Sequence, residues 1–228
     1  MRSGPNMIPT DPRQTAGYLL GLRGKGIRNI GVLRALEQTP RAAFAPPEHA
    51  HLAQTDIALP LACGQTMPEP LYIARLMEAL DLAPHHKVLE IGTGSGFATA
   101  VMAALAGEVV TFERFRALAT QAAKRFRTLN LENVKAVWDD GLAQPHEAGR
   151  YDRIVVHGVI DHVPEVLSTA LAPGGTIFAG RVATPGREPP QEHQWLMRFS
   201  RGAPGSFTAR VMGGCRLLPL CEGRSKAL

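Results

Sequence analysis

The sequence is poor in cysteine, has no long apolar run and carries no strong excess of one charge sign, and each of these features narrows the possible functions. The three cysteines, Cys63, Cys215 and Cys221, share no CxxC spacing and pair with no histidine cluster. We therefore expect neither a disulfide framework nor a metal site, and a reducing cytoplasm is the expected compartment. No apolar stretch approaches the roughly 18 to 20 residues that cross a bilayer. The first residues also lack the apolar stretch of a secretory signal.

Charge and composition are those of a folded protein without a nucleic-acid groove. Basic residues outnumber acidic residues by 25 to 20, which gives a net charge of +5, and they are scattered along the chain. This pattern favours solubility and anionic partners over nucleic acid or a membrane. With 228 residues, 45% of them hydrophobic and 20% charged, the chain can bury a core and is neither disordered nor a coiled coil.

Two compositions follow one another along the chain. Residues 1–71 are rich in proline, glycine and arginine, with one amphipathic segment at 27–36 and no strand long enough to start a sheet. We expect them to form a helical and loop extension that packs over the carboxyl ends of the strands and covers the active site. Residues 72–228 form the second predicted unit, in which short apolar strands alternate with helices.

The alternation in residues 72–228 predicts an α/β fold with a doubly wound, mostly parallel, seven-stranded, Rossmann-like sheet. Strands are expected at 87–91, 109–113, 134–137, 153–157 and 176–180, and helices at 97–106, 115–129 and 163–171. No helix separates the strand-like segments 194–200 and 207–211, so they are expected to pair as an antiparallel edge hairpin. A loop at 185–190 would lead into this hairpin.

A glycine-rich turn between the first strand and the first helix of this unit indicates a ligand site. Gly92, Gly94 and Gly96 let the backbone turn sharply and approach a ligand, and the following helix start offers unpaired N–H groups. The spacing is GxGxG, which differs from the GxGxxG of dinucleotide sites, and Glu90 precedes it. An acid here suits a cationic ligand such as S-adenosylmethionine, which carries an ammonium and a sulfonium.

Two further acids stand where such a ligand would need them. Glu113 ends the second strand and can accept both ribose hydroxyls. Asp140, followed by Gly141, comes just after the third strand and could accept from an adenine amino group. Taken singly, these residues also fit tight packing, an ion pair with Arg114 or an ordinary turn. Together they predict a metal-free S-adenosylmethionine site, made of Glu90, Gly92, Thr93, Gly94, Ser95, Gly96, Glu113, Arg114, Asp140 and Gly141.

Several motifs in the same order give the chain a family resemblance. They are PRAAFAP at 40–46, DIALPLACGQT at 56–66, EIGTGSGF at 90–97, FER at 112–114, YDRIVV at 151–156 and RLLPL at 216–220. On these motifs the chain resembles the protein-L-isoaspartate O-methyltransferases, from Leu22 to about Leu220. The glycine loop is shared by all class I methyltransferases, so the other motifs make the resemblance specific.

The resemblance implies an activity, a cofactor and a partner. It implies that residues 72–228 bind S-adenosylmethionine and that the enzyme methylates the free carboxylate of L-isoaspartyl residues in damaged proteins or peptides, as a step in protein repair. No nucleic acid, membrane or metal would take part. Because the carboxylate is already ionised at neutral pH, the reaction needs no general base. It needs in-line placement of the two reactants and the exclusion of water.

The sequence departs from the family on the substrate side. The resemblance places substrate handling at Gln65, Thr66 and the position of Pro68, and His157, where the sequence departs from the family, is a further candidate for contact with the acceptor. Pro68 stands where the family has a serine implicated in substrate handling, and proline offers neither a side-chain donor nor a backbone N–H, so no catalytic residue is assigned. His157 or His162 could supply a donor, or could merely cap a strand and start a helix. Two alternatives therefore stay open: another carboxylate acceptor, such as a peptide natural product or small acid, and a non-catalytic cofactor-binding homologue.

Overall fold

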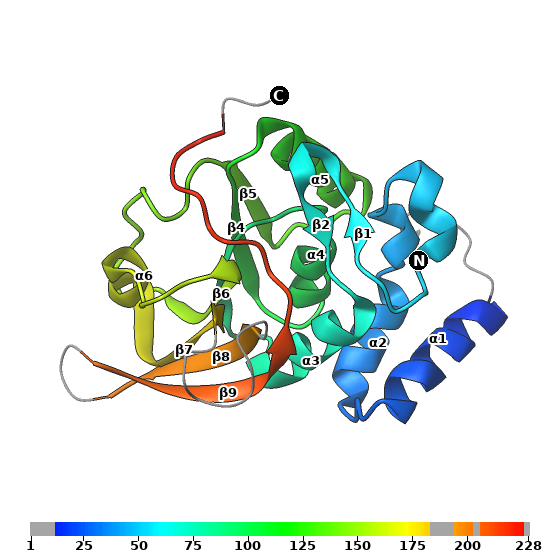
Figure 1. Ribbon diagram of the computed structural model, residues 1–228, viewed down its shortest axis with the longest axis horizontal. Helices are drawn as coiled ribbons and strands as arrows, with labels where there is room; N and C mark the ends of the chain where they lie inside the picture. Colours follow the sequence, from blue (N-terminus) through cyan, green and yellow to red (C-terminus); the bar gives the residue numbers. More distant parts are fainter. Residues whose placement is uncertain (1–11, 183–193, 203–205, 226–228) are drawn as a thin grey trace.

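The computed structural model describes residues 12–182, 194–202 and 206–225. Within them, seven strands form one sheet in the order β5-β4-β3-β6-β7-β8-β9 (Figure 1). Strands β5 to β7 pair in parallel, and β8 and β9 each pair antiparallel with the preceding strand. This confirms the predicted fold class and the antiparallel edge hairpin. The strands are β3 (Lys87–Ile91), β4 (Glu108–Glu113), β5 (Val134–Trp138), β6 (Tyr151–Val159), β7 (Leu171–Val182), β8 (Gln194–Arg201) and β9 (Phe207–Cys215).

Helices cover the two faces of the sheet unequally. The helices are α1 (Pro12–Gly24), α2 (Ile30–Gln38), α3 (Pro70–Leu80), α4 (Phe97–Ala103), α5 (Arg116–Thr128) and α6 (Glu165–Ala170). Side chains alternate along each strand, so in β3 Val88 joins a core with α2 to α5 while Leu89 joins a second core with α6. Because β3 is central in the sheet, every residue of the strand after Lys87 is buried, including Glu90.

Local capping moves several helix ends away from their predicted positions. The helix predicted at 27–36 begins at Ile30, because the Asn29 side chain accepts from the backbone N–H of Val32 at 3.1 Å and caps it there. Ile27 stays buried in the preceding loop. The helix predicted at 97–106 ends at Ala103, and the one predicted at 163–171 is α6, which begins directly after Pro164.

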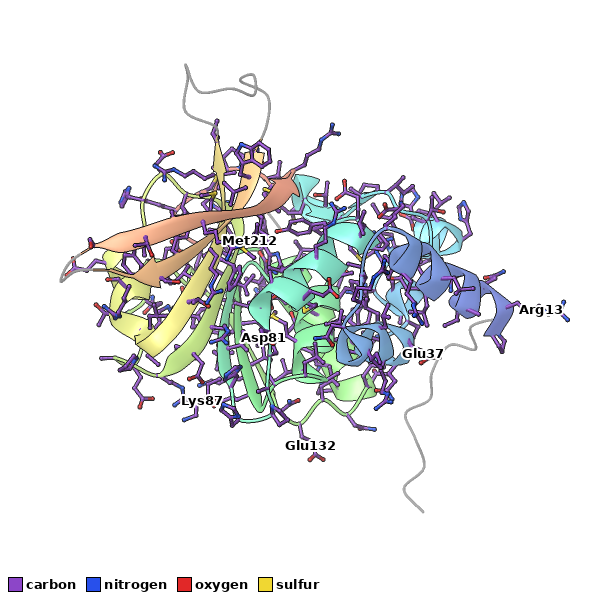
Figure 2. The ribbon with its side chains drawn as sticks, turned by 90° about the horizontal axis from the view of Figure 1, so that it is seen from below. Arg13, Glu37, Asp81, Lys87, Glu132 and Met212 are labelled. Atoms are coloured by element: carbon purple, nitrogen blue, oxygen red, sulfur yellow. The ribbon has the colours of Figure 1, made fainter. Side chains whose placement is uncertain are left out.

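The N-terminal residues differ from the prediction in two respects. They contain helix α1, which the sequence analysis missed, and a two-strand hairpin of β1 (Leu59–Pro60) and β2 (Thr66–Met67) where no strand was expected. Helices α1 and α2 both pack against α3, and α2 also packs against α4. Arg13 at the start of α1 is far from Met212 in the edge strand β9 (Figure 2).

Among the described residues, the stretch at 61–68 and the loop that follows β9 both reach the carboxyl ends of the central strands. Val159 at the end of β6 pairs with Pro219, so this loop runs across those ends (the red segment after β9 in Figure 1). The predicted division at 71/72 falls inside α3 and stays a prediction. The loop predicted at 185–190 lies outside the described residues.

Candidate active site

Two adjoining pockets lie at the carboxyl ends of β3, β4 and β6. The Pro68 pocket spans about 520 Å³ and the Asp140 pocket about 600 Å³, and both volumes include space open to solvent. Both are lined by Gln65, Gly92, His157 and Leu218, so the two spaces meet at these side chains. The Pro68 pocket also contains Thr66, Thr93, Gly94, Ser95 and Arg216, and the Asp140 pocket contains Glu113, Arg114, Asp139, Gly141 and Cys221.

The glycine loop forms the wall that the two pockets share. After β3 ends at Ile91, the backbone turns through positive φ angles of 97° at Gly92 and 55° at Gly94, which favour glycine. The N–H groups of Gly92 and Thr93 both donate to the Phe112 carbonyl oxygen, at 2.8 and 3.2 Å. The loop is therefore fixed to the end of β4 before any ligand is bound.

Two other predicted glycines are required by packing. A Cβ atom on Gly96 would lie 2.7 Å from the Phe126 ring, and one on Gly141 would lie 2.6 Å from Ile91 Cδ1. Gly96 lines neither pocket, whereas Gly141 lines the Asp140 pocket. The motif therefore combines glycines at a ligand site with a glycine that lets α5 approach α4.

The two hydroxyl residues of the loop line the Pro68 pocket. Thr93 Oγ1 lies 2.6 Å from Thr111 Oγ1, and Ser95 Oγ accepts from the Phe97 N–H at 3.2 Å. These contacts tie the loop to β4 and to the first turn of α4.

Glu113 presents a buried carboxylate to the Asp140 pocket. Its Oε2 accepts from the Gly94 N–H at 2.9 Å and its Oε1 from the Phe115 N–H at 2.9 Å. Burial raises the pKa of Glu113, backbone hydrogen bonds counter the rise, and the nearby Glu90 carboxylate adds to it. Each carboxylate oxygen can accept a second hydrogen bond, so Glu113 retains the capacity to bind a pair of hydroxyls.

Asp140 is bound on both oxygens by backbone N–H groups. Oδ1 accepts from Leu142 at 2.9 Å and Oδ2 from Gly223 at 2.6 Å. Arg114 lines the same pocket and donates through Nε to the Gly223 carbonyl oxygen at 2.8 Å. A segment near the C-terminus, which no motif indicated, therefore lies against the adenine-side residues of the predicted site.

Glu90 lies behind the glycine loop. It is 0% exposed and lines neither pocket. Its Oε2 accepts from Thr99 Oγ1 at 2.5 Å, and its Oε1 lies 2.9 Å from His157 Nε2. His157 is the residue of this group that faces the pockets, because it lines both. His162 is exposed and lines neither.

The acceptor-side loop is held by a buried arginine that the sequence analysis did not identify. Arg41 donates to the carbonyl oxygens of Pro68 at 2.9 Å and Met67 at 3.4 Å, and also to those of Ala53 and Ile57. Desolvation lowers the pKa of Arg41 to about 10. The signal available was its position in the PRAAFAP motif. Arg216, also missed as a site residue, begins the RLLPL motif, is exposed and lines the Pro68 pocket.

The predicted site residues are thus brought together, with Glu90 and Gly96 set back from the pocket surface. The geometry can hold two molecules that meet beside Gly92, one facing carboxylates and the other facing Thr66, Arg216 and His157. Among the described residues, no group of three acidic, histidine or cysteine side chains is arranged to hold a metal ion. No helix in the same part of the chain is long and apolar enough to span a membrane.

Comparison with known proteins gives a consistent match. The family model described as protein-L-isoaspartate(D-aspartate) O-methyltransferase matches residues 16–225. Among curated relatives, the protein-L-isoaspartate O-methyltransferase of Azorhizobium caulinodans is 43% identical over 92% of this chain and 94% of its own. That of Nitrobacter winogradskyi is 38% identical over 97% of this chain and 100% of its own.

Solved structures agree with the fold. A protein-L-isoaspartate O-methyltransferase with 25% identity superposes with a TM-score of 0.76 over 91% of this chain and 66% of its own. A structure from Plasmodium falciparum, in complex with S-adenosyl-L-homocysteine, has 19% identity and a TM-score of 0.74 over 90% of this chain and 97% of its own.

Proposed function

The chain belongs to the protein-L-isoaspartate(D-aspartate) O-methyltransferase family, and on this premise we propose that it transfers a methyl group from S-adenosylmethionine to the free carboxylate of L-isoaspartyl residues. The single observation that carries the proposal is the family match over residues 16–225, which contain both pockets. The substrates are damaged proteins and peptides, and the reaction serves their repair. Cytoplasmic action is proposed because the described cysteines are all free thiols.

The residues of the Asp140 pocket fit the methyl donor. S-adenosylmethionine, when bound, supplies an electrophilic methyl group on a sulfonium. Glu113 is placed to accept ribose hydroxyls, and Gly92, with a φ of 97°, lets the backbone approach the ligand closely. Gly94 lines the adjoining Pro68 pocket. Asp140 and Gly141 would border the adenine, with Arg114 beside them. The carboxylates and backbone groups of this pocket suit a cationic nucleoside. Among the described residues, no group of side chains is arranged to bind a metal ion.

Glu90 has an indirect role in this scheme. Because its carboxylate is fully buried and contacts Thr99 and His157, it orients the imidazole at the boundary between the pockets. We propose that His157 faces the acceptor, and that Glu90 keeps its ring in place. Thr93, Ser95 and Gly96 fix the shape of the loop.

The acceptor carboxylate would bind in the Pro68 pocket. Pro68 provides no donor there, but Gln65 and Thr66 line the same space and Arg216 adds a cation. A guanidinium forms strong, paired hydrogen bonds with a carboxylate. The pocket thus attracts an ionised acceptor by charge, and no residue has to remove a proton from it.

A labelling experiment tests this function. Purified protein is incubated with S-adenosylmethionine carrying a radiolabelled methyl group and with an isoaspartyl peptide or its aspartyl twin. We expect base-labile label on the isoaspartyl peptide alone. Label on neither peptide, with donor binding intact by calorimetry, would contradict the proposal and favour another carboxylate acceptor or a non-catalytic homologue. Pro68→Ser is the companion variant, and a large gain in its activity would show that the remaining acceptor site is intact.

A further inference from the structure

We propose that residues 221–225, here called the latch, close the adenosine end of the cofactor site, and that Arg224 is a positioning residue that sets how long the cofactor stays bound. The inference rests on the proposed cofactor site, but it concerns retention of the cofactor rather than the identity of the methyl acceptor.

Backbone contacts of the latch bridge the ends of two strands. The Gly223 N–H donates to Asp140 Oδ2 at 2.6 Å, and the Gly223 carbonyl oxygen accepts from Arg114 Nε at 2.8 Å. The Ser225 N–H donates to the Arg114 carbonyl oxygen at 3.1 Å. Since Arg114 follows β4 and Asp140 follows β5, the latch spans the side of the pocket formed by these two strand ends.

An exposed ion pair between Arg224 and Asp139 holds the latch against the loop after β5. Arg224 donates to both carboxylate oxygens of Asp139, at 2.7 and 2.6 Å, and its guanidinium lies 5.4 Å from the centre of the Trp138 ring. Trp138 is itself fixed by a hydrogen bond from Nε1 to the Arg114 carbonyl oxygen at 3.2 Å. The hydrogen bonds from Arg224 hold the pKa of Asp139 at about 2, so this carboxylate stays charged at neutral pH.

Of the latch residues, Cys221 lines the Asp140 pocket, and Gly223 is hydrogen-bonded to Asp140 and Arg114, which also line it. The pocket is bounded by Glu113, Arg114 and Gly141 on the sheet side, and by the stretch 218–221 that leads into the latch. Release of an adenosine group between these walls would require the latch to leave Asp139 and Asp140. The latch residues 221–224 are exposed, so few apolar contacts oppose opening. The polar contacts, and above all the Arg224 pair, therefore control the opening.

The test measures cofactor release directly. Protein loaded with radiolabelled S-adenosylmethionine is chased with excess unlabelled S-adenosylhomocysteine, and the retained label is followed over time. Loss of an exposed ion pair and a cation–π contact corresponds to roughly threefold to thirtyfold faster release for Arg224→Ala. Arg224→Lys, which keeps the charge without the paired hydrogen bonds, should fall between Arg224→Ala and the wild type. Because Arg224 is a half-exposed surface residue, these variants should fold.

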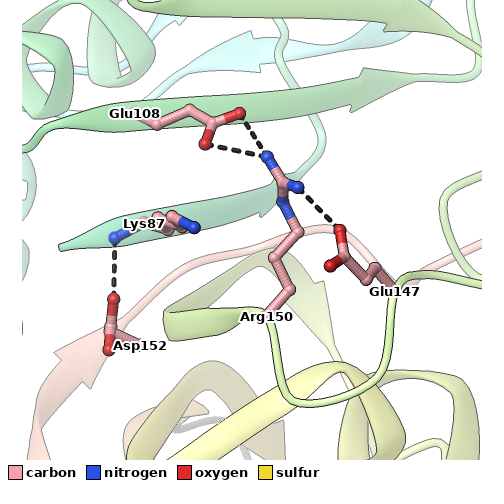
Figure 3. A network of polar contacts seen from close by, with 5 residues as sticks. All are labelled: Lys87, Glu108, Glu147, Arg150 and Asp152. Carbon is pink, nitrogen blue, oxygen red and sulfur yellow. Dashed lines mark hydrogen bonds and ion pairs between the residues drawn. The ribbon is translucent and has the colours of Figure 1, made fainter.

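Arg150→Ala is the matched control. Arg150 pairs with Glu108 at 2.7 Å and Glu147 at 2.7 Å, at the opposite, amino end of the strands (Figure 3). Its removal deletes an ion pair of the same chemistry away from both pockets, so release should change less than about twofold. The dependence of the release rate on salt concentration is a second readout. Higher ionic strength should accelerate release from the wild type and have little effect on Arg224→Ala, since it screens an exposed pair.

The outcomes separate the latch from the proposed function. Equal release rates for wild type and Arg224→Ala, or an equal change in Arg150→Ala, would overturn the latch and leave the proposed function intact. Faster release from Arg224→Ala combined with no isoaspartyl methylation by the wild type would support the latch and refute the acceptor. A wild type that binds no S-adenosylmethionine would refute both.

Discussion

The contact between Glu90 and His157 predicts that Glu90→Gln changes the free energy of unfolding in a direction that depends on the residue at position 157. Glu90 is 0% exposed, and its contacts within the described residues are Thr99 and His157. His157→Ala would leave a buried carboxylate with a hydroxyl as its remaining partner. Loss of a hydrogen bond to a buried charge should lower the free energy of unfolding by about 2 to 4 kcal/mol. At about 2 to 4 °C per kcal/mol for a chain of this size, the thermal midpoint should fall by about 5 to 15 °C.

Glu90→Gln should recover part of the stability that His157→Ala loses. Glu90→Gln removes the buried charge but keeps an oxygen for Thr99 and an amide for His157. In the wild-type background this change should be neutral or destabilising. In the His157→Ala background it should raise the free energy of unfolding by about 1 to 2 kcal/mol, because no uncompensated charge remains.

Urea unfolding of the four proteins at neutral pH measures the coupling. His162→Ala is the control, because His162 is exposed and lines neither pocket, and it should change stability by less than about 0.5 kcal/mol. Equal destabilisation by Glu90→Gln in both backgrounds would refute the reasoning, since it would mean that the contact with His157 does not stabilise the buried Glu90 side chain.

Three further predictions concern single residues. Glu113→Ala should weaken S-adenosylmethionine binding by about tenfold or more in calorimetry, because a buried acceptor for two hydroxyls is lost. Arg216→Ala should raise KM for an isoaspartyl peptide about tenfold while the donor Kd stays unchanged, and a matched change in both constants would contradict its acceptor role. Burial raises the pKa of Tyr18 from 10.0 to about 12. The protonated hydroxyl is thus favoured by folding, and the contribution of Tyr18 to the free energy of unfolding should fall as pH rises from about 10 to 12, while the lowered pKa of Arg41 acts in the opposite direction. Tyr18→Phe should remove that part of the pH dependence in denaturant titrations.

The central part of the fold could be predicted because its signals are local. Strand β3 was expected at the residues where it occurs, and Glu113 ends β4 as anticipated. A continuous apolar run and a glycine turn need no distant partner to be recognised. Helix α1, by contrast, buries Leu22 alone and has a weak apolar stripe, so its pattern resembles that of a loop.

The contacts of Glu90 could not be predicted because they depend on strand register. Parallel pairing sets Ile91 opposite Val156, and the next residue along β6 is His157, which therefore lies beside Gly92. The sequence shows an acid before a glycine loop and a histidine far along the chain. Pairing of β3 with β6 converts that acid from a predicted ligand contact into the support of an imidazole.

The Pro68 pocket shows what the missing serine changes chemically. Because the acceptor carboxylate is already ionised, a serine hydroxyl there would act as a hydrogen-bond donor and not as a base. Its replacement by Pro68 leaves a loop whose carbonyl oxygens are held by Arg41, so the loop keeps its shape while losing that donor. In the proposed function, attraction of the acceptor would then fall to Arg216 and His157, which line the same pocket. Charge acts over a longer range and with less directional demand than a hydroxyl. The Pro68 pocket should therefore discriminate strongly in favour of an ionised carboxylate. It should discriminate less between acceptors that differ in the geometry around that carboxylate.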